Sequence, residues 1–248
     1  MRKLVLIFIL LAVSFGLFAL EVPQLKGTVN DYAGVLSKDQ EHRLESLLRE
    51  TEKQTASQVV LLTIPSLQGE NLEDYSFRVA EKWQLGQKEL DNGVLLLVSM
   101  QEKKIRIEVG YGLESTITDL KSGYIIRKFI VPEFKQGNFY QGISKGLVAI
   151  TGLISNDFEI SQEELAKYQQ ELENSGGHLP IGGIVFLIMI VLGSLGRRGR
   201  RGGILPWLIV GSMLGGGRDH GGGFGGGGFG GFSGGGGSFG GGGASGGW

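Results

Sequence analysis

Acidic and amide side chains flank a central pair of predicted strands, at positions where a cation or a phosphate could bind. Asp91 and Asn92 precede an apolar run, and Glu114 follows a glycine-rich turn. Asp31 and Asp119, from adjoining loops, complete the set. Oxygen ligands that converge from loops are typical of Ca²⁺ and Mg²⁺ sites, and a bound cation could in turn hold a phosphate. The alternative is structural, because Asp-Asn-Gly is ordinary turn sequence and an aspartate also favours a helix N-terminus.

The residues beside these carboxylates offer no activated nucleophile. Gly110, Tyr111 and Gly112 lack the Lys and Ser/Thr of a P-loop, so we interpret them as a tight backbone turn. Arg106 and Glu108 lie two residues apart on one strand face, where a structural pairing with each other or with a neighbouring strand is the favoured interpretation. Arg106 could instead serve an anionic ligand. We therefore place these five residues at the edge of the site and assign no catalytic residue.

The composition excludes several other kinds of site. The chain of 248 residues has no cysteine, which rules out disulfides, thiolate catalysis and cysteine-ligated zinc. Its three histidines are widely separated, so the sequence shows neither a histidine-rich metal site nor a serine-hydrolase triad. The net charge of −1 predicts no general affinity for nucleic acid.

A β-hairpin is expected to position the carboxylates. Residues 94–98 are continuously apolar, as in a central strand that is covered on both faces. Residues 105–109 alternate between apolar and charged, which predicts one buried and one wet face. Residues 100–103 are polar and form the turn. Because the strands of a hairpin are antiparallel, Asp91 and Glu114 should lie at the same edge of the sheet.

The surrounding elements predict an α/β/α sandwich of three layers around a small mixed sheet. Ser37 and Gln40 form a capping box that starts one helix, and Asn71 caps another. The run 58–64 is a second strand, parallel to 94–98 because a helix connects them. Residues 29–34 are expected to form a polar turn. Helices are expected at about 37–55, 71–83, 117–130 and 139–154.

Flanking segments predict export and a membrane anchor. Residues 1–19 have the basic start and apolar core of a signal peptide, with an uncleaved anchor as the alternative. A polar linker helix is expected at 156–178. Residues 179–196 are apolar enough for a transmembrane helix, at the short end of the usual length. Arginines follow at once, so the domain at 22–155 should be extracytoplasmic at the cell membrane.

Two further segments complete the chain. Residues 204–214 are short for a span, so we favour an interfacial segment over a second crossing. Most of the 45 glycines lie after Leu214, and the glycine-rich tail at 215–248 is expected to be disordered. Its aromatic residues could act as weak contacts with lipid, with partners or with other tails.

Several of these motifs resemble the TPM domain. The resemblance covers about residues 22–155, and the wider layout, with a tail ending in Gly-Gly-Trp, is similar to bacterial YgcG-like proteins. The segments that carry it are Val29-Asn30-Asp31-Tyr32-Ala33, Asp91-Asn92-Gly93-Val94-Leu95-Leu96-Leu97, Arg106-Ile107-Glu108-Val109-Gly110-Tyr111-Gly112-Leu113-Glu114, Pro132-Glu133-Phe134, Gly137 and Tyr140.

The resemblance implies a small sheet between helices and a site for a divalent metal, which some family members bind. Plant members of the thylakoid lumen are linked to photosystem II repair and have been proposed to be acid phosphatases, and an animal member is an auxiliary receptor subunit. Carried over to this chain, the positions implied for metal or phosphate are Asp31, Asp91, Asn92, Glu114 and Asp119.

Three functions are compatible with the sequence. The favoured one is a membrane-tethered, extracytoplasmic binding module that uses Ca²⁺ or another divalent cation and acts on protein partners in envelope or membrane-protein maintenance. The second is a metal-assisted acid phosphatase with one carboxylate as general base. The third is a scaffold that self-associates through the glycine-rich tail. We prefer the first, because no Cys, His or Lys is placed to activate a nucleophile.

Overall fold

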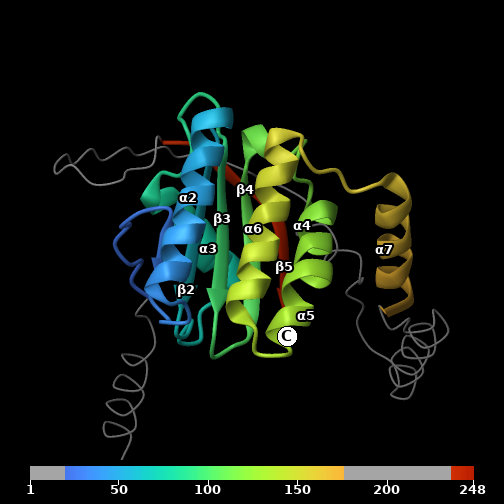
Figure 1. Cartoon of the computed structure of the whole chain (residues 1–248), viewed down its shortest axis with the longest axis horizontal. Coiled ribbons are helices and arrows are strands. Elements are labelled where there is room, and N and C mark those ends of the chain that lie inside the picture. Colours follow the sequence, from blue (N-terminus) through green and yellow to red (C-terminus); the bar gives the residue numbers. More distant parts are fainter. Residues whose placement is uncertain (1–19, 176–235) are drawn as a thin grey trace, which may run out of the picture. The chain divides into compact units, whose positions relative to one another are not determined.

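A five-stranded mixed sheet forms the centre of the domain in the computed structural model, which describes residues 20–175 and 236–248 (Figure 1). Strand order follows chain order. The first three strands are parallel, and the last two pairings are antiparallel. The strands are β1 (Val29–Asp31), β2 (Gln58–Ile64), β3 (Gly93–Ser99), β4 (Lys104–Gly110) and β5 (Phe239–Gly247).

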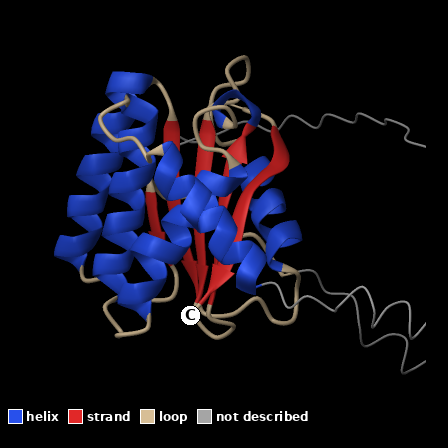
Figure 2. Cartoon of the chain, turned by 90° about the vertical axis from the view of Figure 1, so that its right-hand side faces the viewer, coloured by secondary structure: helices blue, strands red, loops and turns tan. Residues whose placement is uncertain are grey.

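Helices cover both faces of this sheet, and Figure 2 shows the strands running between them. One face packs on α3, and the other packs on a layer that includes α2, α4 and α6. The architecture is the mixed α/β fold that the sequence predicts. The helices are α2 (Lys38–Thr55), α3 (Leu72–Trp83), α4 (Asp119–Ile125), η2 (Ile126–Ile130, a π-helix), α5 (Val131–Phe134), α6 (Phe139–Ser155) and α7 (Gln162–Ser175), with a 3₁₀ turn, η1 (Tyr111–Leu113).

Alternating side chains of β2 and β3 fill the two cores. Val59 and Leu96 lie on the face that packs on α2 and α6, whereas Leu62 and Leu95 lie on the face that packs on α3. Every residue of both strands is buried, as a central parallel pair requires. The predicted βαβ crossover and the β3–β4 hairpin are both confirmed.

Local capping explains where two helices begin. The Ser37 hydroxyl accepts a hydrogen bond from the Gln40 N–H, and the Gln40 amide oxygen accepts one from the Ser37 N–H. The Asn71 side chain accepts from the Asp74 N–H in the same way. Both caps confirm the sequence-based assignments, because they satisfy amide groups that no helical carbonyl can reach.

Two predicted elements differ from the observed ones. Residues 29–31 form strand β1, where a polar turn was expected, because their backbone pairs with β2. The predicted helix 117–130 is an α-helix followed by the π-helix η2, and the chain then continues helically through Pro132. Pro132 donates no backbone N–H, and it directly follows the π-helical stretch, where the Val131 N–H bonds the Ile126 carbonyl five residues back.

The far end of the glycine-rich tail is folded, which corrects the expectation of disorder throughout 215–248. Residues 239–247 form β5 on the outer edge of β4. Strand β4 is also buried on both faces, where one wet face was expected: α3 packs on that face and β5 pairs with its edge, so Arg106 is 6% exposed and Glu108 is 0% exposed. Backbone pairing with β4 supplies the hydrogen bonds of β5, so β5 forms a strand without an alternating apolar pattern.

The predicted signal peptide at 1–19, the transmembrane helix at 179–196 and the apolar segment at 204–214 lie outside the described residues. Within the described part of the chain, the helices are all too short or too polar to span a membrane.

Candidate functional site

The outer edge of β4 forms a groove that holds the end of the glycine-rich tail. The register runs from Lys104 opposite Gly247 to Val109 opposite Gly242, and a bulge then places Gly110 opposite Phe239. We call residues 236–248 the tail segment. The β4 groove is the outer edge of β4 with the flanking side chains that contact this segment, which are Glu73, Asp91, Arg106, Tyr111, Glu114, Asp119, Ile126, Phe134 and Phe139.

Carboxylates of the groove accept hydrogen bonds from the tail segment. Asp91 Oδ1 accepts from the Ser238 N–H at 2.6 Å, and Asp119 Oδ1 accepts from the Gly243 N–H at 2.7 Å. Glu73 accepts from the Ser245 hydroxyl at 2.6 Å. The Ser245 hydroxyl lowers the pKa of Glu73, since this hydrogen bond favours the charged form. Charged acceptors make stronger hydrogen bonds than neutral ones, so these contacts add to the backbone ladder.

Arg106 binds the tail segment from within the protein. Its Nη2 donates to the carbonyl oxygens of Gly241 at 2.8 Å and Gly242 at 3.4 Å. Its Nε pairs with Glu108 Oε2 at 2.8 Å, which confirms the predicted pairing, and the Ser76 hydroxyl donates to the same oxygen at 2.9 Å. Glu108 thereby holds the planar guanidinium with one edge aimed at the tail.

Burial dominates the charge state of this pair. Desolvation raises the pKa of Glu108, although the hydrogen bonds and charge of Arg106 and the Ser76 hydroxyl act in the opposite direction. The second oxygen of Glu108 has no hydrogen-bond partner among the described residues. Because Arg106 is the charged partner of this buried carboxylate, losing it would leave the negative charge uncompensated.

The groove is shaped for glycine. A Cβ atom on Gly243, whose φ is +120°, would overlap the backbone carbonyl of Ile107. A Cβ on Gly246 would lie 2.5 Å from Cγ2 of Ile126, and one on Gly240 would enter the ring of Tyr111. Since the carbonyl of Ile107 is part of the sheet and cannot move away, the position of Gly243 is the most restrictive.

Aromatic side chains fix both ends of the tail segment. Phe239 is buried in the core beneath α3, at 5% exposed. Trp248 makes edge-to-face contacts with Phe134, at 4.7 Å between ring centroids, and with Phe139, at 6.3 Å. The two rings belong to opposite faces of the sheet, because Phe134 lies in the other core. They set the register of a strand that glycine alone would leave poorly specified.

Three of the predicted metal ligands, Asp91, Glu114 and Asp119, lie beside the tail segment at the β4 groove. The Gly112 N–H donates to the Asp91 carbonyl at 3.1 Å, so the turn before Glu114 lies beside Asp91, as the hairpin predicts. Glu114 and Asp119 line an open hollow of about 530 Å³ with the backbone of residues 240–242. The tail segment therefore lies over the carboxylates that the sequence singles out.

The other two predicted ligands have structural contacts elsewhere. Asn92 accepts from the Gln87 N–H and donates to the Ala56 carbonyl, so both ends of its amide are used. Asp31 accepts from two backbone N–H groups and from the Thr63 hydroxyl. Its register position, opposite Thr63 and hence level with Val98, is at the other end of β3 from Asp91. In the described part of the chain, no three acidic or histidine side chains converge as metal ligands would.

The turn that follows β4 depends on its two glycines. A Cβ on Gly110 would overlap the Asp91 carbonyl, and a Cβ on Gly112 would overlap the Leu90 carbonyl. This close backbone approach matches the interpretation of the Gly-Tyr-Gly motif as a tight turn. Tyr111 between them is 55% exposed and presents its ring to Gly240.

Several groove residues carry no signal that sequence reasoning could use. Glu73 is an ordinary position of an amphipathic helix in the sequence, and Phe134 has the pattern of a core residue. The only available hints were Phe239 and Trp248, large aromatic residues in an otherwise glycine-rich stretch. Their spacing does not predict which strand they pair with, because the glycines between them have no side chains that would distinguish the two faces of a strand.

The α/β domain is similar to known proteins. The family model for the TPM domain matches residues 29–153. The N-terminal domain of a protein from P. gingivalis is 32% identical, with a TM-score of 0.50 over 53% of this chain and 84% of that one. The BA42 protein of Bizionia argentinensis is 23% identical, with a TM-score of 0.44 over 52% of this chain and 88% of that one. No curated protein matches the chain.

The matched region contains the α/β domain from β1 to α6, with the hairpin and the Gly-Tyr-Gly turn that border the groove. It spans half of the chain and leaves the tail segment outside. On this evidence, the chain belongs to the TPM-domain family.

Proposed function

We propose that this domain is a peptide-binding module whose β4 groove takes an extended, glycine-rich segment, and that its own tail segment is one such ligand. The observation that carries this proposal is β5, a strand added to the sheet edge by residues far along the chain. Strand addition of this kind is a common mode of peptide recognition, in which backbone hydrogen bonds give affinity and side-chain contacts give specificity.

Specificity has three sources in this groove. The carbonyl of Ile107 excludes any side chain at position 243, and Arg106 donates hydrogen bonds to the carbonyls of Gly241 and Gly242. The aromatic contacts of Phe239 and Trp248 then set the register. A ligand of this groove is therefore a strand with aromatic residues at its ends and glycine between them.

A matched pair of full-length variants tests the proposal. Gly243→Asn, the open-groove variant, should release its own tail because the new side chain overlaps the sheet. Gly241→Asn is the control, since Gly241 also has a positive φ of +79° but nothing within 4 Å. A synthetic peptide of residues 236–248, measured by calorimetry, should bind the open-groove variant at least about tenfold more tightly than the control, whose own tail competes.

The peptide provides a second comparison. Peptide carrying Gly243→Asn should bind the open-groove variant at least about thirtyfold more weakly than the unmodified peptide, a difference of about 2 kcal/mol. Peptide carrying Gly241→Asn should stay within about threefold of the unmodified one. Equal affinities for all three peptides, or no binding of any, would contradict the proposed groove.

We further propose that the module acts outside the cell membrane, tethered to it, and meets protein partners there. The signal-like residues 1–19 and the apolar residues 179–196 support this proposal. A protease added to intact cells should then cleave the domain, while a cytoplasmic marker protein stays whole. Resistance of the domain until the cells are opened would contradict it.

A metal-assisted phosphatase is the second candidate. The supporting observation is that Asp91 and Asp119 accept hydrogen bonds from tail amides, so both carboxylates lose a donor when the tail leaves. Ca²⁺ should then raise the melting temperature of the open-groove variant, and Asp91→Ala should abolish the rise. Hydrolysis of a simple aryl phosphate should be lost in Asp91→Asn or Glu114→Gln. Turnover equal to the mutant background would remove this candidate.

A further inference from the structure

We propose that the tail segment is exchanged between copies, so that the β4 groove of one chain takes residues 236–248 of a second copy. This inference rests on the proposed peptide-binding function and names the partner. It differs from intramolecular docking in the source of the strand alone, because the contacts are the same in both arrangements.

The first argument is that the contacts of β5 are all non-local. The hydrogen bonds of its side chains and flanking amides join it to residues 124 to 172 positions away, as in Asp119–Gly243 and Glu73–Ser245. The ladder with β4 is equally distant along the chain. None of these contacts depends on the covalent connection, so the corresponding residues of another copy satisfy them equally well.

The second argument is the length of the connection. Sixty residues, 176–235, separate the end of α7 from the tail segment. Linking the tail to its own domain adds no contact and only raises its effective concentration, which reaches the millimolar range for short linkers and falls with length. Chains that are locally concentrated therefore compete for each other's grooves.

The third argument is the character of the strand itself. Six of the nine residues of β5, at 240–243, 246 and 247, are glycine, so they place no side chain on either face of the sheet. Glycine loses the most conformational freedom on docking, which weakens the binding of the strand to its own groove and makes its release cheaper than the release of a strand with larger side chains. Its departure exposes the backbone groups of β4, which form a ready site for another strand.

The occupant is identified by its chemistry. The groove requires glycine where Gly243 and Gly246 lie and aromatic rings at the positions of Phe239 and Trp248. A second copy carries that combination by definition. Because groove and tail are different surfaces, each copy can give one strand and receive another. Such head-to-tail contacts build closed rings or open chains.

Two complementary full-length variants isolate exchange from intramolecular docking. The open-groove variant, Gly243→Asn, has an intact groove and a defective tail. The donor variant, Arg106→Met with Glu108→Leu, has an intact tail and lacks the guanidinium that binds Gly241 and Gly242. Replacing both members of the buried pair by apolar side chains avoids an unpaired charge.

Mixed in one detergent, the two variants should form a 1:1 heterodimer, measured by light scattering after size exclusion. Its amount should be at least about tenfold above that in either variant alone at the same total concentration. The free 236–248 peptide should dissociate the heterodimer by competing for the β4 groove. The matched control is the donor variant that also carries Gly243→Asn, and this change should prevent formation of the heterodimer.

The two possible failures are distinguishable. If the peptide binds the open-groove variant but the mixture stays monomeric, the exchange is wrong and the peptide-binding function stands. If the peptide also fails to bind, the groove itself is wrong and the exchange falls with it. A heterodimer that persists in the control, or that the peptide leaves intact, comes from another surface and also overturns the exchange.

Discussion

The carboxylate of Asp91 accepts a hydrogen bond from the Ser238 N–H at 2.6 Å, although 147 positions separate the two residues. Asp91 itself has a positive φ of +47°, a conformation that asparagine and aspartate tolerate better than most residues. One residue thus shapes the turn before β3 and binds the tail segment.

Substitutions of Asp91 should separate these two roles. Asp91→Asn keeps the turn and an acceptor but removes the charge, so peptide affinity should fall about fivefold with the free energy of unfolding nearly unchanged. Asp91→Ala loses both and should also lower the free energy of unfolding by about 1 kcal/mol. Calorimetry with the open-groove variant and urea unfolding measure the two effects. Equal unfolding free energies for both variants would contradict the strain argument.

Gly112 should be intolerant of any side chain. Gly112→Ala places a methyl group on the Leu90 carbonyl, which should lower the free energy of unfolding by about 2 kcal/mol or more. Gly27→Ala is the matched control, because its new Cβ would lie at an ordinary 3.4 Å from Glu45. Urea unfolding of both variants tests the prediction, and similar decreases in their free energies of unfolding would contradict it.

Arg106 and Glu108 should tolerate double but not single replacement. Arg106→Ala leaves a buried carboxylate unpaired and should cost about 3 to 5 kcal/mol in unfolding free energy. Arg106→Met with Glu108→Leu should restore most of that stability. Added to the open-groove variant, the same pair should weaken binding of the 236–248 peptide at least about tenfold relative to the open-groove variant alone. Thermal unfolding and calorimetry measure the two quantities. A double variant as unstable as the single one would contradict the uncompensated-charge explanation.

Trp248 should be the strongest single side chain of the ligand. Peptide with Trp248→Ala loses both edge-to-face contacts and should bind about thirtyfold more weakly to the open-groove variant. Trp248→Phe keeps an aromatic ring against Phe134 and should stay within about fivefold. The same titrations measure both affinities. A Trp248→Ala peptide that binds as tightly as the unmodified peptide would contradict the prediction that Trp248 contributes most to the affinity.

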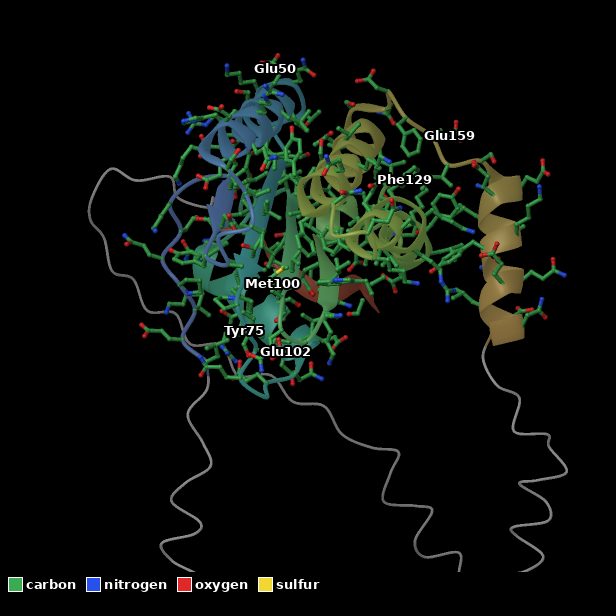
Figure 3. All side chains as sticks on the ribbon, turned by 60° about the horizontal axis from the view of Figure 1, so that its bottom comes forward. Glu50, Tyr75, Met100, Glu102, Phe129 and Glu159 are labelled. Carbon is green, nitrogen blue, oxygen red and sulfur yellow. The ribbon has the colours of Figure 1, made fainter. Side chains whose placement is uncertain are left out.

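Glu102, which is labelled in Figure 3 and lies in the same β3–β4 turn as Met100, should make stability depend on acid pH. Burial acts to raise its pKa, but hydrogen bonds from the Ser99 and Ser66 hydroxyls and the Leu67 N–H outweigh it and lower the pKa to about 2. A depressed pKa contributes stability above the unfolded value of 4.5, and that contribution is lost as pH falls towards 2.

The pH dependence has a direct control. Glu102→Gln should lower the free energy of unfolding by about 2 kcal/mol at neutral pH and flatten its decline between pH 4.5 and about 2. Unfolding curves across that range compare the two chains. Parallel declines in both would show that other carboxylates carry the effect.

Sequence reasoning was most reliable where side chains alternate or helices are capped. The Ser37 cap, the apolar run of β3 and the charged turn at 100–103 all have local causes, so the hairpin and the crossover were predictable. The hairpin also predicted that Asp91 and the turn before Glu114 lie together.

The failures have one physical origin, which is pairing at long range. Strand β1 is too short to show a period and is defined by its partner β2, so its end carries Asp31 away from the other carboxylates. Strand β5 consists mainly of glycine, which gives no pattern to read. Arg106 and Glu108 were expected on a solvated face because the sequence shows neither that α3 packs on this face nor that β5 pairs with the edge of the strand.

The position of β5 restricts how the chain can be threaded through a bilayer. The domain and the tail segment meet, within one chain or between two, so both ends of residues 176–235 must face the same compartment. One passage through the membrane at 179–196 would leave them on opposite sides. For the membrane tether proposed above, an even number of passages would satisfy this requirement. The return would then use residues 204–214, the second crossing that the sequence made the less favoured alternative, with Arg197, Arg198, Arg200 and Arg201 on the cytoplasmic side.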